Sequence, residues 1–180
     1  MASRHNDFLA AGGRIFGIVV DSPAQNSALI QKLSLPFPIL SDPDRDRAIG
    51  PMGYSNLTDP RNIGLPGTVI VGTDGAEAFR WESRDFADRI PEDDVIAALE
   101  RVGGGATSQE PPTLGPAEPS PKALPFEQMG PYFRGARFAA QALGVRHKDA
   151  YPDIKDDSKA YIAEMDRYLA AYNALKESRA

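Results

Sequence analysis

The side chains that could serve as nucleophiles, bases or metal ligands are few in this sequence. It contains no cysteine and only two histidines, His5 and His147, so it offers neither a thiolate nor a histidine cluster for zinc. Disulfides and thiolate metal sites are excluded for the same reason. Ser22 and Ser41 lie outside a G-x-S-x-G motif, the turn that exposes a hydrolase serine. Both are typical of helix caps, so we assign no catalytic residue.

Acidic residues gather in one stretch, at Asp42, Asp44, Asp46 and Asp59. A calcium loop of the EF-hand type also needs a spaced glycine and a terminal bidentate glutamate, which this stretch lacks. Helix capping beside solvated arginines accounts for the carboxylates better. The glycines at 12–13 and 103–105 form neither a G-x-G-x-x-G nor a P-loop pattern. We therefore expect no metal, no cofactor and no phosphate-binding loop.

The composition is that of an ordinary globular protein. Hydrophobic residues make up 42% and charged residues 25% of the 180 positions. The net charge of -5 argues against a nucleic-acid surface, which would carry a basic patch. No apolar run approaches the roughly 20 residues that cross a bilayer, and residues 1–13 lack the regions of a signal peptide. We expect a cytoplasmic protein that binds neither membranes nor nucleic acid.

A proline- and glycine-rich stretch at 103–125 divides the chain. It has no periodic apolar pattern, and its prolines favour extended segments, so it predicts a semi-rigid linker. We therefore expect one domain at 1–102, the linker at 103–125 and a helical extension at 126–180.

Strand and helix patterns alternate before the linker. The apolar run from Ile15 to Val20 predicts a buried strand, and Ser22 with Pro23 predicts the start of a helix that ends near Leu33. The next elements are expected at 39–40 (apolar pair), 42–49 (short helix), 68–71 and 76–81 (hairpin strands) and 91–101 (helix). Trp81, with Phe79 and Arg80, could line a surface groove, although alternation along a strand favours core packing.

Two helices are expected after the linker. Pro131 should open the first and Gly144 should end it, while Asp156 to Ser158 should cap the second. One stripe of the second helix is apolar and rich in tyrosine, and its members are Tyr161, Met165, Tyr168, Leu169, Tyr172 and Leu175. The pattern predicts a helical hairpin whose stripe is a core or an interface.

The run GRIFGIVVDSPAQNSALIQKLSLPFPILSDPDRDRAIG, followed by GLPGTVIVGTDGAEAFRW, resembles the middle of a peroxiredoxin of the alkyl hydroperoxide reductase and thiol-specific antioxidant (AhpC/TSA) type. The resemblance covers about residues 8 to 101. It implies an α/β fold: a thioredoxin-like sheet with flanking helices, N-terminally incomplete, plus the C-terminal helical hairpin. It also implies a family activity, thiol-dependent peroxide reduction, which is an antioxidant oxidoreductase reaction.

The parts of that family that carry its chemistry have no counterpart in this sequence. The strand and the helix that present the peroxidatic cysteine come before the segment with which Met1 begins. The family's arginine, just before the threonine strand, is replaced near Leu65, and Arg61 has the wrong spacing. Pro66 stands where the resemblance implies a proline that is often cis; a plain strand-starting turn is the alternative.

A strand missing from the centre of such a sheet would leave the edges of the strands near 14–20 and 68–71 unpaired. The gap could be closed by direct pairing of those strands, by a homodimer or a partner chain, or by a longer protein of which this chain is a truncated reading frame. We expect truncation, and an inactive chain. The alternative function is a noncatalytic thioredoxin-like interaction module that associates through its sheet edge and its tyrosine-rich helices.

Overall fold

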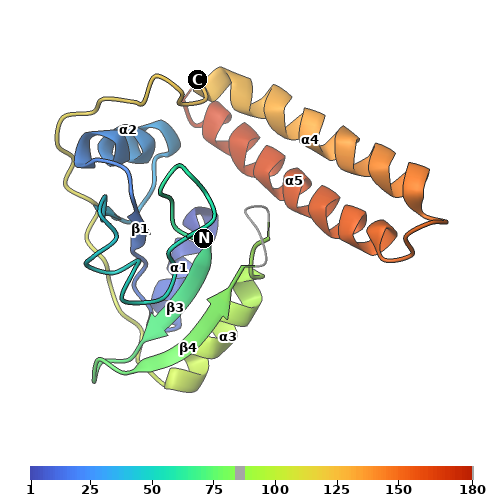
Figure 1. Ribbon diagram of the computed structural model, residues 1–180. Helices are drawn as coiled ribbons and strands as arrows, with labels where there is room; N and C mark the ends of the chain where they lie inside the picture. Colours follow the sequence, from blue (N-terminus) through green and yellow to red (C-terminus); the bar gives the residue numbers. More distant parts are fainter. Residues whose placement is uncertain (84–87, 180) are drawn as a thin grey trace. The chain divides into compact units, whose positions relative to one another are not determined.

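A computed structural model describes residues 1–83 and 88–179 of the chain. The chain divides into two compact units, Met1–Ser120 and Pro121–Ala180 (Figure 1). The first unit is mixed α/β and the second is a helical hairpin, as the sequence predicts. No described helix is long and apolar enough to span a membrane.

The first half of unit 1 is a strand–helix–strand segment. Strand β1 (Gly17–Val19) pairs in parallel with β2 (Ile39–Ser41), and α2 (Pro23–Leu33) connects them. The side chain of Ser22 accepts a hydrogen bond from Gln25 N, and the Gln25 side chain accepts one from Ser22 N. This reciprocal capping box confirms the predicted start of the helix.

The second half of unit 1 is a β-hairpin. Strand β3 (Gly67–Val71) pairs antiparallel with β4 (Glu77–Glu82), and the turn between them contains Gly75 at φ +81°. That left-handed conformation is one that glycine adopts without steric cost. The predicted Thr73–Gly75 turn and both of its strands are therefore confirmed.

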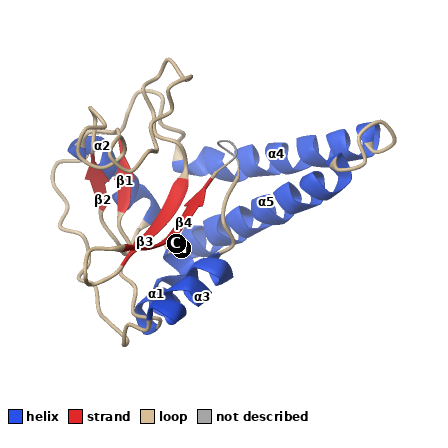
Figure 2. Ribbon diagram, turned by 60° about the horizontal axis from the view of Figure 1, so that its bottom comes forward, coloured by secondary structure: helices blue, strands red, loops and turns tan. Residues whose placement is uncertain are grey.

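The core of unit 1 lies against one face of this hairpin. Phe8 comes from α1 (His5–Ala10), Ile70 from β3, and Val95 and Ala98 from α3 (Glu92–Val102); each is at most 7% exposed. A short 3₁₀ helix (Ala2–Arg4) precedes α1. The two strand pairs form separate sheets: among the described residues, β1 and β3 share no ladder (Figure 2). Direct pairing of those strands, one of the expected ways to close the gap, is absent.

The short helix expected at 42–49 is not formed; this prediction is wrong. The segment is a series of turns in which Arg45 adopts φ +62°. A right-handed helix cannot pass through a residue in that region. The carboxylate of Asp42 nevertheless accepts hydrogen bonds from the backbone N–H groups of Arg47, Ala48 and Ile49, at 3.2, 3.0 and 2.8 Å. The aspartate therefore caps a turn instead of a helix.

The first part of the proline-rich segment lies along unit 1. Thr107 N donates to Leu9 O, and Glu118 N donates to Ala24 O. Between them, the side-chain amide of Gln109 accepts a hydrogen bond from Ile15 N and donates one to Ile15 O, at 3.0 and 2.6 Å. Residues 107–118 are therefore bound to helices α1 and α2 and to the approach to β1.

Unit 2 consists of α4 (Phe126–His147) and α5 (Ile154–Glu177), which pack side by side (Figures 1 and 2). The predicted boundaries were wrong. Pro131 lies inside α4, and Gly144 does not end it but is buried against Ser158. Helix α5 begins at Ile154, before the predicted cap at 156–158. The tyrosine-rich stripe of α5 faces α4, with Met165 and Tyr172 at most 9% exposed.

Candidate functional site

Both sheets of unit 1 have strand edges that pair with no other described strand. In a parallel ladder, the N–H and C=O of one residue point to the same side and alternate along the strand. Gly17 N donates to Pro38 O, and Asp42 N donates to Val19 O, so Ile18 directs its N–H and C=O away from β2. In the β3–β4 ladder, Ser83 N donates to Pro66 O, so every second residue of β3 after Pro66 directs its N–H and C=O toward β4. The N–H and C=O groups of Gly67 and Val69 therefore point away from β4.

The β1–β2 sheet also has an uncovered apolar face. Helix α2 covers the opposite face, because Asn26 Nδ2 donates a 2.9 Å hydrogen bond to Ser41 Oγ. Ile18 and Leu40 are register partners that point to the other side, and they are 39% and 48% exposed. Phe16, just before β1, is 51% exposed. Parallel sheets are normally covered on both faces, so this face lacks a layer.

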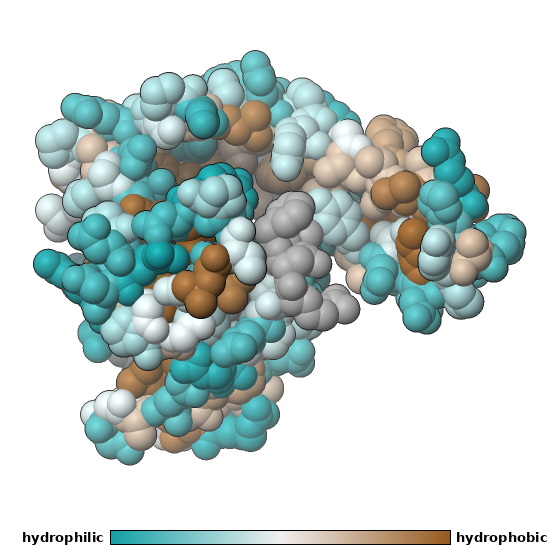
Figure 3. All heavy atoms as spheres, viewed as in Figure 1, coloured by the Kyte–Doolittle hydropathy of each residue, from teal (hydrophilic) through white to brown (hydrophobic). Residues whose placement is uncertain are grey.

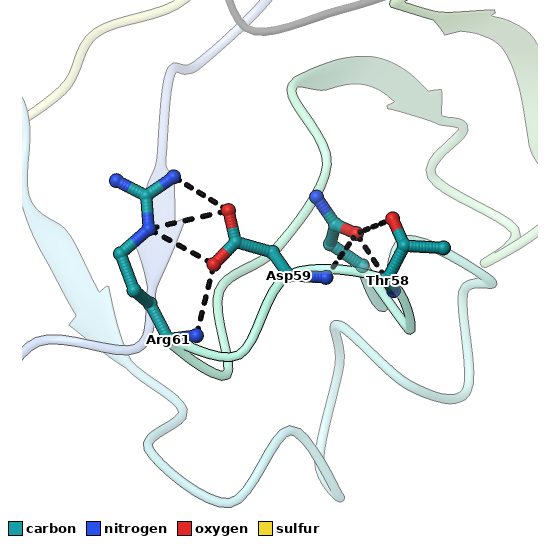
Figure 4. Close-up of polar contacts among 4 residues, drawn as sticks. Thr58, Asp59 and Arg61 are labelled. Atoms are coloured by element: carbon teal, nitrogen blue, oxygen red, sulfur yellow. Dashed lines mark hydrogen bonds and ion pairs between the residues drawn. The ribbon is translucent and has the colours of Figure 1, made fainter.

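The loop before β3 holds Arg61, the arginine that the sequence places nearest to the family position. Its backbone N and guanidinium donate to the carboxylate of Asp59, with the shortest guanidinium contact at 2.5 Å (Figure 4). The guanidinium hydrogen bond is the main cause that lowers the pKa of Asp59 to about 2. Asn56 Oδ1 accepts hydrogen bonds from Thr58 N, Thr58 Oγ1 and Asp59 N, which fixes the turn. Arg61 is therefore engaged within its own loop.

The Leu65–Pro66 peptide is trans, since the described residues contain no cis bond. Of the two alternatives for Pro66, the structure has the plain strand-starting turn. Leu65 N donates to Tyr54 O, and Leu65 is 39% exposed.

The acidic stretch does not form a metal site. Within the described residues, no group of three or more His, Asp or Glu side chains could hold a metal ion. Asp42 is 2% exposed and engaged in capping. Burial raises the pKa of Asp42, but the three backbone hydrogen bonds lower it more in sum, so the net shift is downward. Asp44 and Asp46 are exposed, and Asp59 binds Arg61.

The prediction that both serines cap helices is confirmed for Ser22 and wrong for Ser41. Ser22 caps α2, whereas Ser41 is the acceptor for Asn26 in β2. Phe79 packs against the core, while Arg80 lies on the other face of β4 with its guanidinium carbon 5.0 Å from the Tyr54 ring centroid.

The two histidines lie in different units. His5 is 9% exposed, and its Nε2 lies 3.0 Å from Gln109 Oε1. His147, in the last turn of α4, stacks near Tyr151 with ring centroids 6.3 Å apart. The sequence does not single out Gln109, because a polar residue among prolines carries no local signal of a contact with distant residues.

Part of the chain matches the model of a known protein family. The model of the AhpC/TSA family matches residues 1–76, which run from α1 through β3 to the turn that follows it. No curated protein matches the chain.

Proposed function

We propose that this chain, whose residues 1–76 match the model of the AhpC/TSA family, is a noncatalytic, thioredoxin-like association module. Its partner is an extended, apolar strand from another polypeptide, which pairs with the free edges of β1 and β3. The observation that carries the proposal is the pair of unshared ladders whose outer groups, on Ile18, Gly67 and Val69, point away from β2 and β4.

The proposal gives the chain no peroxidase activity of its own. Reduction of a peroxide by this family's chemistry forms a cysteine sulfenic acid, which a second thiol then reduces. The 180-residue sequence contains no cysteine that could be oxidised in this way. Its nearest arginine, Arg61, is bound by Asp59 and does not offer a free guanidinium.

The chemistry of the uncovered face defines the partner strand. Phe16, Ile18 and Leu40 present apolar side chains next to the free edge of β1. Main-chain pairing supplies affinity in strand addition, and side-chain pockets supply specificity. The partner should therefore be rich in valine and isoleucine, free of proline and followed by a segment that covers this apolar face.

The test uses a synthetic peptide of alternating valine and isoleucine with lysines at both ends. On binding to the full chain, the backbone amides of Ile18 and Val69 should gain protection from hydrogen exchange, measured by NMR. The amide of Gly17 already bonds to Pro38 O, just before β2, and serves as an internal control. Protection that is absent at Ile18 and Val69 at saturating peptide would overturn the proposal.

A matched variant separates edge pairing from nonspecific adhesion. Ile18→Pro removes the N–H that points away from β2 and should abolish peptide binding. Leu57→Pro changes a loop residue that is 87% exposed and should leave binding unchanged. A coupled peroxide assay on the chain alone should give no thiol-dependent turnover, and measurable turnover would contradict the noncatalytic assignment.

A further inference from the structure

One face of α4 is fully used by α5. Gly130 lies against the Tyr172 ring, where an added Cβ would be 2.7 Å from Cε1. Gly144 lies against Ser158, where an added Cβ would be 2.6 Å from Oγ. Phe126 stacks on Tyr172 with centroids 5.0 Å apart, and Arg137 Nε donates to Asp166 at 2.7 Å. These contacts fix which side of α4 faces its neighbour.

The opposite side of α4 is also apolar. Its stripe, which we call the outer stripe, recurs at alternating spacings of four and three residues: Pro131, Gly135, Phe138, Ala142 and Val145. Phe138 is 63% and Val145 is 67% exposed, and a Cβ added to Gly135 would meet nothing within 4 Å. Figure 3 shows brown and tan hydrophobic atoms on the surface of unit 2. A helix that is apolar on both sides is expected to be buried on both sides.

We propose that the outer stripe is the interface with a second copy of the chain, packed antiparallel so that two hairpins form a four-helix bundle. The mean spacing of 3.5 residues is that of a coiled-coil seam between helices. In the antiparallel layers of such a seam, Phe138 lies over Gly135 of the second copy, and Pro131 lies over Ala142. Each larger side chain then meets a smaller one, which allows close packing.

Charge complementarity selects the antiparallel arrangement. Glu127 and Lys148 lie at opposite ends of α4 and are separated by 21 positions, which is three heptads, so both are on the same flank of the stripe. In an antiparallel pair, the same flank of α4 meets its counterpart, and the N-terminal end of one helix lies beside the C-terminal end of the other. Each Glu127 then lies beside Lys148 of the second copy. Both residues are exposed in the single chain.

The exposed area is of the size that a modest dimer needs. Beside the stripe, Tyr132 is 58% and Leu143 is 49% exposed. Together with Phe138 and Val145, these side chains leave on the order of 400 Å² uncovered per copy, given aromatic surfaces of roughly 150–250 Å² each. A standard interface buries about 800 Å² per partner. The four side chains therefore supply about half, and the small residues and arginine stems of α4 supply the rest.

This interface does not rest on strand pairing at β1 and β3, and two variants separate the two proposals. Sedimentation equilibrium of the full chain should show a dimer of about 39 kDa, twice the 19.4 kDa of one chain, as concentration rises through the micromolar range. Phe138→Lys should weaken dimerisation at least tenfold, whereas Ile18→Lys in unit 1 and Leu57→Lys should not. Circular dichroism verifies that the helices persist. Dimerisation that Ile18→Lys abolishes and Phe138→Lys spares would overturn the inference.

The absence of native cysteine makes the orientation directly measurable. A chain with Glu127→Cys and a chain with Lys148→Cys, mixed and mildly oxidised, should form a disulfide-linked dimer. Neither chain alone should, because equal positions would lie roughly 30 Å apart along the antiparallel helices. Cross-links in the separate chains and none in the mixture would exclude this arrangement.

A charge exchange completes the test. Glu127→Lys alone and Lys148→Glu alone should each weaken the dimer several-fold by placing like charges together, and the double variant should restore it. A chain that stays monomeric at all concentrations would overturn the proposal and would leave the outer stripe to unit 1 or to a different protein.

Discussion

The phenolic oxygen of Tyr54 donates a 2.9 Å hydrogen bond to the main-chain carbonyl of Trp81. The ring of Tyr54 lies so close to Gly67 that an added Cβ would be 2.0 Å from its Cε1. One side chain therefore joins the loop before β3 to both strands of the hairpin. The Arg80 guanidinium over the same ring and its bond to Met52 O strengthen this attachment.

Replacing Tyr54 with phenylalanine should lower the free energy of unfolding by about 1 kcal/mol, because the hydroxyl is lost and Trp81 O no longer accepts its hydrogen bond. Chemical denaturation with urea measures the difference. Tyr151→Phe is the matched control: Tyr151 is 64% exposed, and its substitution should have no measurable effect. Equal stability of the two variants would mean that the Tyr54 bond contributes nothing.

Asp42→Asn should destabilise unit 1 more than any other aspartate substitution in the 42–46 stretch. Asp42 is 2% exposed and accepts three backbone N–H bonds, whereas Asp44 and Asp46 are exposed. The amide accepts fewer and weaker bonds than the carboxylate. Among D42N, D44N and D46N, thermal unfolding should give D42N the lowest melting temperature by a clear margin. An unchanged melting temperature for D42N would refute the capping role.

Asp59 should titrate well below an ordinary aspartate. Its pKa falls from 3.8 to about 2 in the folded chain, chiefly through the hydrogen bond from Arg61. A carboxylate whose folded pKa is below its unfolded value adds stability above the unfolded pKa. That contribution disappears as the pH falls from about 4 to 2. An NMR titration of the Asp59 carboxyl carbon measures the midpoint, which Arg61→Gln should raise and Arg14→Gln should leave in place.

Gln109→Ala should release the proline-rich segment from unit 1. The amide side chain makes two hydrogen bonds to the backbone of Ile15, and its oxygen lies 3.0 Å from His5 Nε2. Without them, limited proteolysis at residues 105–120 should become several-fold faster, since local opening costs less. Gln128→Ala, at an exposed position of α4, is the control and should leave the cleavage rate as it is.

Local signals in the sequence account for much of unit 1. The capping box at Ser22 and Gln25, the turn at Gly75 and the alternation along β4 are short-range patterns whose physics lies within a few residues. They placed α2 and the hairpin correctly. The unpaired edge of β1 also follows from the absence of a neighbouring strand that the resemblance implies.

Other features depend on contacts between distant residues and could not be predicted. Glycine is common at helix ends, which is why the sequence predicts an end at Gly144. In the structure, the absence of a side chain at Gly144 makes room for Ser158, and α4 continues past it. Pro131 removes one backbone donor inside α4, a loss that the packing with α5 outweighs. Arg45 breaks the expected helix at 42–49 through a backbone conformation for which its residue type gives no sign.

The separation of β1–β2 from β3–β4 has a consequence for how unit 1 moves. A continuous sheet opens as one cooperative body, but two ladders without a shared strand can open one at a time. Binding of a partner strand would then do more than add contacts: it would join two ladders that can open separately into a single cooperative folding unit.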